Sequence, residues 1–398
     1  MTGWLGNVRN NRALWFVVLI GLVSLLADTT YEGARSVIGP YLGVLGATGA
    51  AVGFIAGAGE LSGYVLRLFS GVLADRTQRY WAIAIVGYCV NLLAVPALAL
   101  AGNWPLAGAL IVTERLGKGL RTPARDAMLS HATKDLGRGW AFGIHEAMDQ
   151  IGGMLGPIIV AVVLFVRNAY EPAFALLAIP AVLAISVLLL ARHEYPRPRE
   201  LEPLAQPVQA KGLPRAYWLY LAAIACVAAG FADFALIAFH FARTGIVSAT
   251  LIPILYAVAM GVDGLAALVF GRMFDRVGFL SLILGFGVAI AFAPLVFLGG
   301  FVVALLGTVF WGIGLGAQES IMRAAVAEMV SPDRRGSAYG VFNAGYGVAW
   351  FLGSTVMGFL YDATLVAVVV FSVIVQIVSL PILVKLWRAQ ALRPAEAV

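Results

Sequence analysis

Apolar stretches of about 18–25 residues, separated by short polar breaks, run along nearly the whole chain. A helix needs about 20 apolar residues to cross the hydrocarbon core of a bilayer, so each stretch has the length of a membrane span. The pattern predicts twelve helices, at residues 13–35, 49–74, 81–101, 104–124, 138–165, 172–191, 216–242, 250–271, 279–299, 301–322, 337–360 and 364–387. The shortest breaks are Gly102-Asn103-Trp104-Pro105 and Gly299-Gly300.

Composition agrees with this pattern. Of the 398 residues, 61% are apolar and 12% charged, and the mean hydropathy is +0.90. Soluble domains are about 45–50% apolar and about 25% charged. A soluble enzyme, a nucleic-acid binder and a disordered scaffold are therefore excluded. The net charge of +6 would suggest nucleic acid in a soluble protein, but here the bilayer explains it and we expect no nucleic-acid partner.

The positive charges predict how the chain lies in the membrane. Of the 27 Lys and Arg residues, 21 fall on one side of the twelve predicted spans. The opposite side holds Arg35, Arg167 and Arg243, and the spans hold Arg67, Arg115 and Lys118. The positive-inside rule then predicts a multi-pass protein of the plasma (inner) membrane with both termini in the cytoplasm. We interpret the first apolar segment as a retained helix rather than a signal peptide.

The chain also repeats itself. Gly71-Val-Leu-Ala-Asp75-Arg76 closes the second predicted helix, and Gly271-Arg-Met-Phe-Asp275-Arg276 closes the eighth, 200 residues later. The repeat predicts an N-terminal six-helix bundle over 1–191, a cytoplasmic linker over 192–214 and a C-terminal six-helix bundle over 215–398. Parallel repeats of this kind are typical of transporters that bind substrate near the membrane midplane, between the halves.

Three segments resemble motifs of the major facilitator superfamily, and the resemblance covers essentially the whole chain. The loop from Gly71 to Tyr80 is similar to the family signature between the second and third helices, with Gln78 and Tyr80 as departures. Arg115-Leu-Gly-Lys118-Gly119 resembles the fourth-helix motif. Gly152-Gly-Met-Leu-Gly156-Pro157 resembles the fifth-helix motif of drug–proton antiporters, but Val160 and Ala161 stand where that motif closes on a glycine pair.

The resemblance implies an all-α integral membrane fold, with twelve transmembrane helices in two pseudo-symmetric six-helix bundles. In that family the first, fourth, seventh and tenth helices line the cavity. The resemblance therefore places Asp28, Glu32, Arg115, Asp233 and Glu319 on or near it.

Two sets of residues have a predicted conformational role. An Asp at a helix end can accept backbone N–H groups, and the neighbouring Arg can pair with a carboxylate, which makes a charge latch that breaks in the other state. We predict a gating motif of Gly71, Asp75, Arg76, Arg79, Asp126, Gly271, Asp275 and Arg276. Gly152, Gly156 and Pro157 permit close helix approach and a bend, and plain packing is an equal explanation for these three.

Nine acidic residues fall inside predicted spans, where a charge costs at least about 2.5–3.5 kcal/mol. They are Asp28, Glu32, Glu60, Glu114, Glu146, Asp149, Asp233, Asp263 and Glu319. Most must face a water-filled cavity, form ion pairs or be protonated. We predict a proton and substrate cavity lined by Asp28, Tyr31, Glu32, Arg35, Glu114, Arg115, Lys118, Glu146, Asp149, Asp233, Gln318 and Glu319.

The excess of acids over bases inside the spans favours a cation or protons as the ligand. Asp28 and Glu32 lie one turn apart on one helix face and are the preferred sites, with Arg115 adjusting their proton affinity. Structural ion pairs are the alternative: Glu114 with Lys118, and Glu60 with Arg67.

The sequence therefore predicts a secondary transporter that works by alternating access, with proton-coupled export of a small lipophilic or cationic compound. A proton-linked importer of a nutrient or metabolite is the first alternative, and a membrane enzyme or non-transporting receptor is the second. Without a nucleotide-binding loop or nucleophile elbow, we expect no enzyme activity and no cofactor, with a proton gradient as the energy source. His145-Glu146-Ala-Met-Asp149 lacks the second histidine of a zinc-protease helix, so no metal is expected. We expect a monomer in the lipid bilayer.

Overall fold

The computed structural model describes the chain except for residues 1–11, 133–137, 197–211, 331–333 and 392–398. Its first half contains α2 (Arg12–Arg35), α3 (Ile38–Val44), α4 (Gly49–Thr77), α5 (Tyr80–Ala97), η1 (Leu98–Leu100), α6 (Trp104–Ala132), α7 (Arg138–Arg167), α8 (Tyr170–Leu176) and α9 (Ala178–Glu194). The second half contains α10 (Arg215–Gly230), α11 (Phe234–Thr244), α12 (Leu251–Val277), α13 (Phe279–Ala289), α14 (Phe292–Leu298), α15 (Phe301–Met329), α16 (Arg335–Ala363) and α17 (Leu365–Ala391).

The protein is an all-helical, multi-pass membrane protein, and the described ranges contain no strand. Within them, ten segments are long and apolar enough to cross a bilayer. Helix α6 joins them as a span only when its buried charges, among them Glu114, Arg115 and Arg121, are counted as facing protein rather than lipid. With α6 and α16 the arrangement is consistent with the predicted twelve spans.

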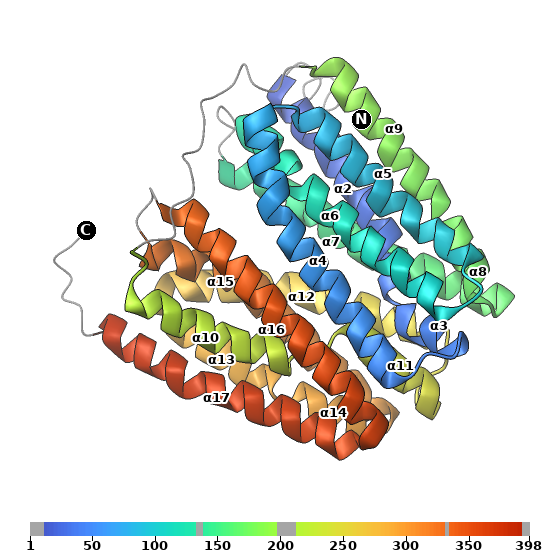
Figure 1. The fold of residues 1–398 in the computed structure, drawn as a ribbon, viewed down its shortest axis with the longest axis vertical. Coiled ribbons are helices and arrows are strands. Elements are labelled where there is room, and N and C mark those ends of the chain that lie inside the picture. Colours follow the sequence, from blue (N-terminus) through green and yellow to red (C-terminus); the bar gives the residue numbers. More distant parts are fainter. Residues whose placement is uncertain (1–11, 133–137, 197–211, 331–333, 392–398) are drawn as a thin grey trace.

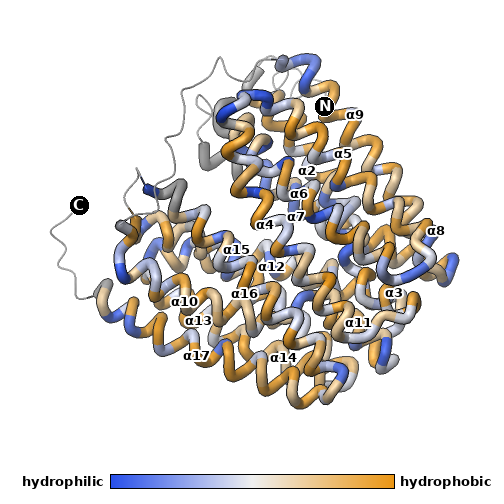
Figure 2. Tube along the Cα trace, viewed as in Figure 1, coloured by the Kyte–Doolittle hydropathy of each residue, from blue (hydrophilic) through white to orange (hydrophobic). Residues whose placement is uncertain are grey.

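The helices form two groups that meet along a long seam (Figure 1). Helices α2, α4, α5, α6, α7 and α9 pack on one another, as do α10 and α12 to α17. Between the groups, α4 packs on α16, α7 on α12, and α3 on α11. Figure 2 shows hydrophobic residues over most of each helix and hydrophilic residues at helix ends and in the middle, around α6 and α7. The predicted linker, 192–214, falls mostly on 197–211, outside the described residues.

The sixth, seventh and ninth predicted spans are each broken into two helices, the third ends in η1, and a further helix follows the predicted end of the first. In the first, α2 ends at Arg35 and α3 continues to Val44. In the seventh, α10 ends at Gly230 and α11 begins at Phe234. At the break between α10 and α11, side chains donate hydrogen bonds to the backbone carbonyls that the helices leave unpaired, as a membrane interior requires. Trp311 Nε1 donates to Ala232 O at 2.9 Å, and Ser372 Oγ donates to Gly230 O at 2.6 Å.

The break between α2 and α3 corrects the place given to Arg35. Because the first predicted span ends at Arg35, the sequence places this residue among the bases beyond the membrane surface. Since α3 continues the span, the Arg35 side chain lies inside the protein, with 14% of it exposed. The same break adds Tyr41 to the buried core, where its hydroxyl donates to Leu98 O at 2.7 Å.

Glycines set how closely the helices approach. A Cβ at Gly152 would lie 2.3 Å from Leu25 O, and one at Gly156 2.2 Å from Thr29 O, so α7 packs against α2 backbone to backbone. Gly353, which the repeat aligns with Gly156, meets Ala229 O of α10 at 2.0 Å in the same test. Gly152, Gly156 and Pro157 of the predicted fifth-helix motif therefore lie in a tight helix contact.

One end of the seam between the halves is closed by a carboxylate on a helix N-terminus. Asp362, in the last turn of α16, accepts hydrogen bonds from Gly49 N at 2.9 Å and Ala50 N at 2.8 Å, the first residues of α4. Arg243 Nη1 of α11 lies 3.7 Å from Asp362 Oδ1. Because the positive end of a helix stabilises a negative charge, this contact favours the arrangement in which this end is shut.

Replacing Asp362 by alanine should therefore open this end. A capping carboxylate contributes about 0.5–2 kcal/mol, which is a shift of about 2- to 30-fold in the equilibrium between closed and open. Spin labels at the exposed Val44 and Val366, with Cys89 and Cys226 replaced by alanine, would report a longer distance in the variant by pulsed electron paramagnetic resonance. Glu171→Ala on α8, outside the contact, is the control. An unchanged distance distribution in Asp362→Ala would show that the contact is incidental.

Candidate functional site

A cavity of about 320 Å³ lies between the two groups of helices and is lined by eight acidic and six basic side chains. Ten of the twelve predicted cavity residues line it: Asp28, Tyr31, Glu32, Arg35, Arg115, Lys118, Glu146, Asp149, Gln318 and Glu319. Its volume lies at the lower end of the range for small-molecule sites, about 300–1,000 Å³. All six bases come from α2, α4 and α6. The wall formed by the first half therefore carries positive charges, whereas the wall formed by the second half carries none among the described residues.

The other two predicted residues lie behind the wall. Glu114 is buried on α6, where it accepts a hydrogen bond from Asn91 Nδ2 at 2.6 Å and lies 3.4 Å from Arg115 Nε. Asp233 occupies the break before α11, accepts a hydrogen bond from Ala235 N at 2.9 Å and lies 3.2 Å from Arg35 Nη2. Each acts as a structural partner of a cavity arginine.

Arg35 is the centre of an ionic network that joins three helices and both halves. Its guanidinium lies 3.3 Å from Glu60 of α4, 3.2 Å from Asp233 of the α11 terminus and 3.7 Å from Glu32 of its own helix. Arg115 of α6 extends the network, with Nε 3.3 Å from the same Glu60 oxygen. The charges are thus arranged in alternation, which lowers the cost of holding them within the membrane.

This network corrects two expected pairs. Glu60 was expected to pair with Arg67 on its own helix, but its partners within ion-pair distance are Arg35 and Arg115 from neighbouring helices. Glu114 was expected to pair with Lys118, but it pairs with Arg115. The reason is helix approach, because a Cβ at Gly59 of α4 would lie only 3.0 Å from Arg115 Cγ. Charged side chains on two closely packed helices therefore lie nearer to each other than charged side chains one turn apart on the same helix.

Three side chains contact the Glu32 carboxylate. Lys118 Nζ lies 3.8 Å from its carboxylate, Arg35 lies 3.7 Å away, and Tyr256 of α12 donates a short hydrogen bond to it. Lys118 also sits over the Tyr31 ring, 4.0 Å from its centroid. Two bases and a hydroxyl stabilise the charged form of Glu32, which makes it an ion-pair partner and a link between the halves.

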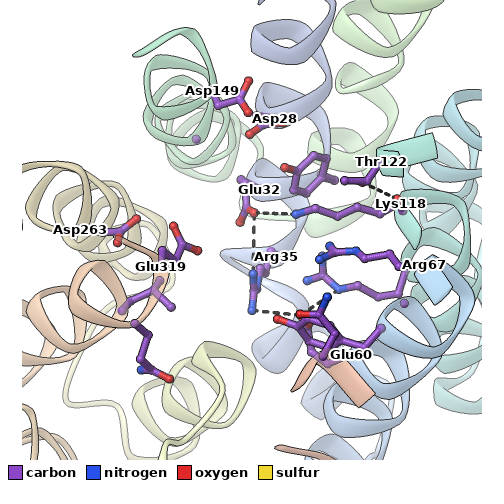
Figure 3. A pocket seen from close by; sticks show the side chains of 18 of the residues that line it. Asp28, Glu32, Arg35, Glu60, Arg67, Lys118, Thr122, Asp149, Asp263 and Glu319 are labelled. Carbon is purple, nitrogen blue, oxygen red and sulfur yellow. Dashed lines mark hydrogen bonds and ion pairs between the residues drawn. The ribbon is translucent and has the colours of Figure 1, made fainter. Parts of the chain in front are cut away.

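Asp28 and Asp149 form a different kind of group. Figure 3 shows the two carboxyls at one end of the cavity, facing each other from α2 and α7. Each has one buried oxygen, Oδ1, without a hydrogen-bond partner among the described residues. Behind them, His145 Nδ1 lies 3.4 Å from Asp149, and His145 Nε2 lies 2.8 Å from Ser24 Oγ. Arg125 is at the limit of contact with Asp149, at 4.0 Å.

Among the described residues, the charged side chains of the opposite wall are both acids, Asp263 and Glu319. Asp263 of α12 is buried and accepts a hydrogen bond from Gln150 Nε2 of α7 at 3.3 Å, across the two halves. Glu319 of α15 projects into the cavity (Figure 3). Beside it, Gln318 accepts a hydrogen bond from the hydroxyl of Tyr346 at 3.0 Å. The aromatic residues Phe342, Tyr346 and Trp350 line the cavity from α16.

The predicted cavity set left out several lining residues. Glu60 and Asp263 were recognised as intramembrane acids but were not placed in the set. Arg121 and Arg125 continue the i, i+4, i+7 stripe of Glu114 and Lys118, and that spacing is the signal by which they could have been included. The aromatic wall follows a spacing of four on α16, which is also what an ordinary packed helix shows.

The predicted gating residues lie at helix ends, away from this cavity except for Asp126. Gly71 and Arg76 lie in the last two turns of α4, and Gly271, Asp275 and Arg276 in the last two turns of α12. Arg76, Arg79, Asp275 and Arg276 lie at the surface or close to it. Asp126 lies 2.8 Å from Arg125. The side chain of Asp75 lies outside the described residues, so the predicted latch stays a prediction.

One group has the spacing of a metal site. Ligand atoms of His145, Glu146 and Asp149 lie within 4.8 Å of one another. However, the contacts of its members favour a hydrogen-bonded chain, because His145 already contacts Asp149 and Ser24, and Arg125 lies beside Asp149. A positive guanidinium next to a ligand carboxylate opposes a metal cation.

Comparison with known proteins gives consistent matches over almost the whole chain. A family model described as Major Facilitator Superfamily matches residues 17–354 and also 221–397. The uncharacterized protein Rv2265 of Mycobacterium tuberculosis is 41% identical over 384 residues, 94% of each chain. The uncharacterized MFS-type transporter MJ1317 of Methanocaldococcus jannaschii is 26% identical over 379 residues, 89% of this chain and 91% of the relative.

Solved structures share the fold. A bacterial homolog to the human lysosomal transporter Spinster, inward-facing and occupied, matches with a TM-score of 0.76 and 17% identity over 96% of this chain and 98% of the other. The nucleoside transporter NupG matches with a TM-score of 0.70 and 16% identity, over 95% and 100% of the two chains. A POT family transporter in complex with a thioalcohol conjugated peptide matches with a TM-score of 0.76 and 12% identity, over 95% and 96%.

Proposed function

This chain belongs to the Major Facilitator Superfamily, and from that membership we propose that it is a proton-coupled antiporter that exports a small lipophilic or cationic compound. That the protein is a membrane transporter rather than an enzyme follows from the family and the fold. Proton coupling, direction and substrate are the proposed part. In this proposal the protein lies in the plasma membrane as a monomer with both termini in the cytoplasm, and the end closed by Asp362 faces outward.

The observation that supports proton coupling is the pair Asp28 and Asp149. Two carboxyl groups that face each other inside a membrane cannot both be charged at low cost, so one proton shared between them is the favoured state. Each has an oxygen with no hydrogen-bond partner among the described residues. The pair lines the cavity, so a proton can exchange with water there. Compared with the expected sites Asp28 and Glu32, Asp149 replaces Glu32, because two bases and Tyr256 hold Glu32 charged.

The direction of a pH gradient separates export from import. In proteoliposomes with an acidic interior, an antiporter takes up a permeation-limited cation such as ethidium as protons leave, and interior pyranine reports the rise in pH. A proton-linked importer needs the reverse gradient. Transport of a neutral nutrient driven by the reverse gradient, with no cation uptake, would overturn the export proposal.

Replacing Asp28 and Asp149 by asparagine should separate coupling from binding. Gradient-driven accumulation should fall at least about tenfold, because the energy of the proton gradient no longer reaches the substrate. Exchange of labelled for unlabelled substrate at equal pH should persist, because it needs no net proton movement. Glu171→Gln, an exposed acid outside the cavity, is the control. Undiminished gradient-driven accumulation in the double variant would show that the proton is carried elsewhere.

A further inference from the structure

Three cavity acids have no basic side chain within ion-pair distance among the described residues, and two of them, Asp263 and Glu319, come from the half opposite Asp28 and Asp149. They are Glu146 of α7, Asp263 of α12 and Glu319 of α15. Glu319 and Glu146 both act on Asp263, and Glu146 acts on Glu319, so the negative charges of the three acids repel one another. Lys118 and Arg35 act on Glu319 from beyond ion-pair distance, and both already lie within that distance of Glu32. This acidic wall therefore has no ion-pair partner in the described part of the protein.

Packing explains why the acids meet. Helices α12 and α15 approach closely at Gly316, where a Cβ would lie 2.4 Å from Asp263 O. Glu319 is one turn beyond Gly316, which places its carboxylate next to Asp263 (Figure 3). Glu146 comes from the other half, one turn before Gln150, which donates to Asp263. The three acids thus lie where the halves face each other.

A second observation points to a ligand. Asp263 is 2% exposed and lines the cavity, yet its Oδ1 has no hydrogen-bond partner among the described residues. The indole nitrogen of Trp350, which lines the same cavity at 4% exposure, is also without a partner in that part of the chain. A buried carboxylate oxygen without a partner is costly, and a bound cation removes that cost.

The neighbouring aromatic wall indicates what kind of cation fits. Phe342, Tyr346 and Trp350 follow one another along α16, with ring centroids 6.2 and 5.6 Å apart. Tyr64 of α4 meets Tyr346 edge-on at 5.4 Å. Aromatic faces attract weakly hydrated organic cations and provide apolar contact, whereas metal ions such as Ca²⁺ and Mg²⁺ prefer oxygen ligands alone.

We propose that Glu146, Asp263 and Glu319, with the aromatic wall of Tyr64, Phe342, Tyr346 and Trp350, form the binding site for an organic ammonium group bearing an aromatic or aliphatic body. Asp263 and Glu319 lie on the half opposite the Asp28–Asp149 pair, and Glu146, within 4.8 Å of Asp149, lies between the two groups. Substrate and proton are then held by different but neighbouring carboxyls. The inference rests on the proposed transport function for its purpose, but binding can be measured without proton coupling. Because Gln150 already links Asp263 to α7, a cation bound there acts on the contact between the halves.

Binding to purified protein tests the site directly. The probes are aromatic ammonium ions of increasing size, beginning with benzyltrimethylammonium, together with neopentylbenzene, the uncharged isostere of that first ion. Their binding is measured by tryptophan fluorescence and by calorimetry. We expect the ammonium series to bind and the isostere to bind at least about tenfold more weakly. Asp263→Asn and Glu319→Gln should each weaken the ammonium about tenfold, as expected for loss of a charged partner. Trp350→Leu should weaken it about 3- to 30-fold.

Variants elsewhere distinguish this inference from the proposed function. Asp28→Asn alone, which leaves Asp149 beside Glu146 in place, should bind the ammonium ions with unchanged affinity even though proton coupling is lost, and Glu171→Gln should behave as the unmodified protein. Thermal unfolding of each variant without ligand shows that it is folded. Three results would overturn the proposal: no ammonium ion binds, Na⁺ or Ca²⁺ binds instead, or Asp263→Asn and Glu319→Gln bind as before and alter only the pH dependence of transport. If binding is as expected but no pH gradient drives transport, the proposed coupling fails and the site stands.

Discussion

Replacing Gly53 by valine is expected to leave a folded protein that no longer transports. Gly53 lies on α4 in the first half, and a Cβ there would lie 2.3 Å from Ser354 O and 2.9 Å from Gly358 Cα on α16 in the second half. Valine therefore cannot fit while this end of the seam is closed. Overpacking of this kind costs about 1–3 kcal/mol, a shift of about 5- to 150-fold toward the open arrangement.

The location of the glycine decides which property is lost. The contact joins the two halves, so each half keeps its own packing and the chain should unfold at a temperature close to that of the unmodified protein. Alternating access requires both arrangements to be populated, so gradient-driven uptake should fall at least about tenfold. Spin labels at Val44 and Val366 should report a longer distance, in the same sense as in Asp362→Ala but further.

Two other glycines provide matched comparisons for Gly53→Val. Gly287 on α13 has open space around its Cβ position, so Gly287→Val should transport normally. Gly156 contacts α2 within one half, at 2.2 Å from Thr29 O, so Gly156→Val should lower the unfolding temperature or the yield of folded protein. Normal uptake by Gly53→Val, with an unchanged label distance, would mean that the close approach of α4 and α16 is not part of the transport cycle.

The sequence predicted the helices well because span length is a property of the local chain. The pair Gly299-Gly300 was enough to separate α14 from α15. The breaks inside spans could not be predicted, because what stabilises them is distant in sequence. The carbonyls near residue 231 are satisfied by Trp311 and Ser372, which are 79 and 142 residues from their partners.

In the candidate site, too, some features follow from the local sequence and others depend on residues distant in the chain. Helical spacing alone places Asp28 and Glu32 on one face. Intramembrane position, together with the family resemblance, placed Glu319 at the cavity, but the same reasoning also placed Glu114 and Asp233 there, and these lie behind its wall. Ion-pair partners depend on how closely two helices approach, as with Glu60 and Arg115 across Gly59. A single sequence does not contain that distance. The pairing of Asp28 with Asp149 likewise required the backbone contact of α2 with α7, where a Cβ at Gly152 would also lie 3.0 Å from Asp28 Cβ.

Replacing Arg35 by glutamine should produce the largest loss of stability among the charged residues of the cavity. Arg35 lies within 4 Å of Glu32, Glu60 and Asp233. Without it, Glu32 keeps Lys118 and Glu60 keeps Arg115, but Asp233 has no other base within ion-pair distance in the described ranges. Leaving a buried charge uncompensated costs about 3–5 kcal/mol. We expect a clearly lower unfolding temperature in detergent and little transport. Arg167→Gln, at an exposed helix end, is the control and should change neither.

Pairing can be separated from plain loss of the arginine by a second substitution. Asp233→Asn removes the charge but still caps α11, because asparagine is as good an N-cap as aspartate. If the uncompensated carboxylate causes the loss, Arg35→Gln with Asp233→Asn should be more stable than Arg35→Gln alone, since removing both members of a buried pair is often nearly neutral. The double variant should still transport poorly, because Arg35 and Asp233 join α2 to α11 across the two halves. Equal stability of the single and double variants would instead place the effect on Glu60, and Glu60→Gln in the Arg35→Gln background would then restore it.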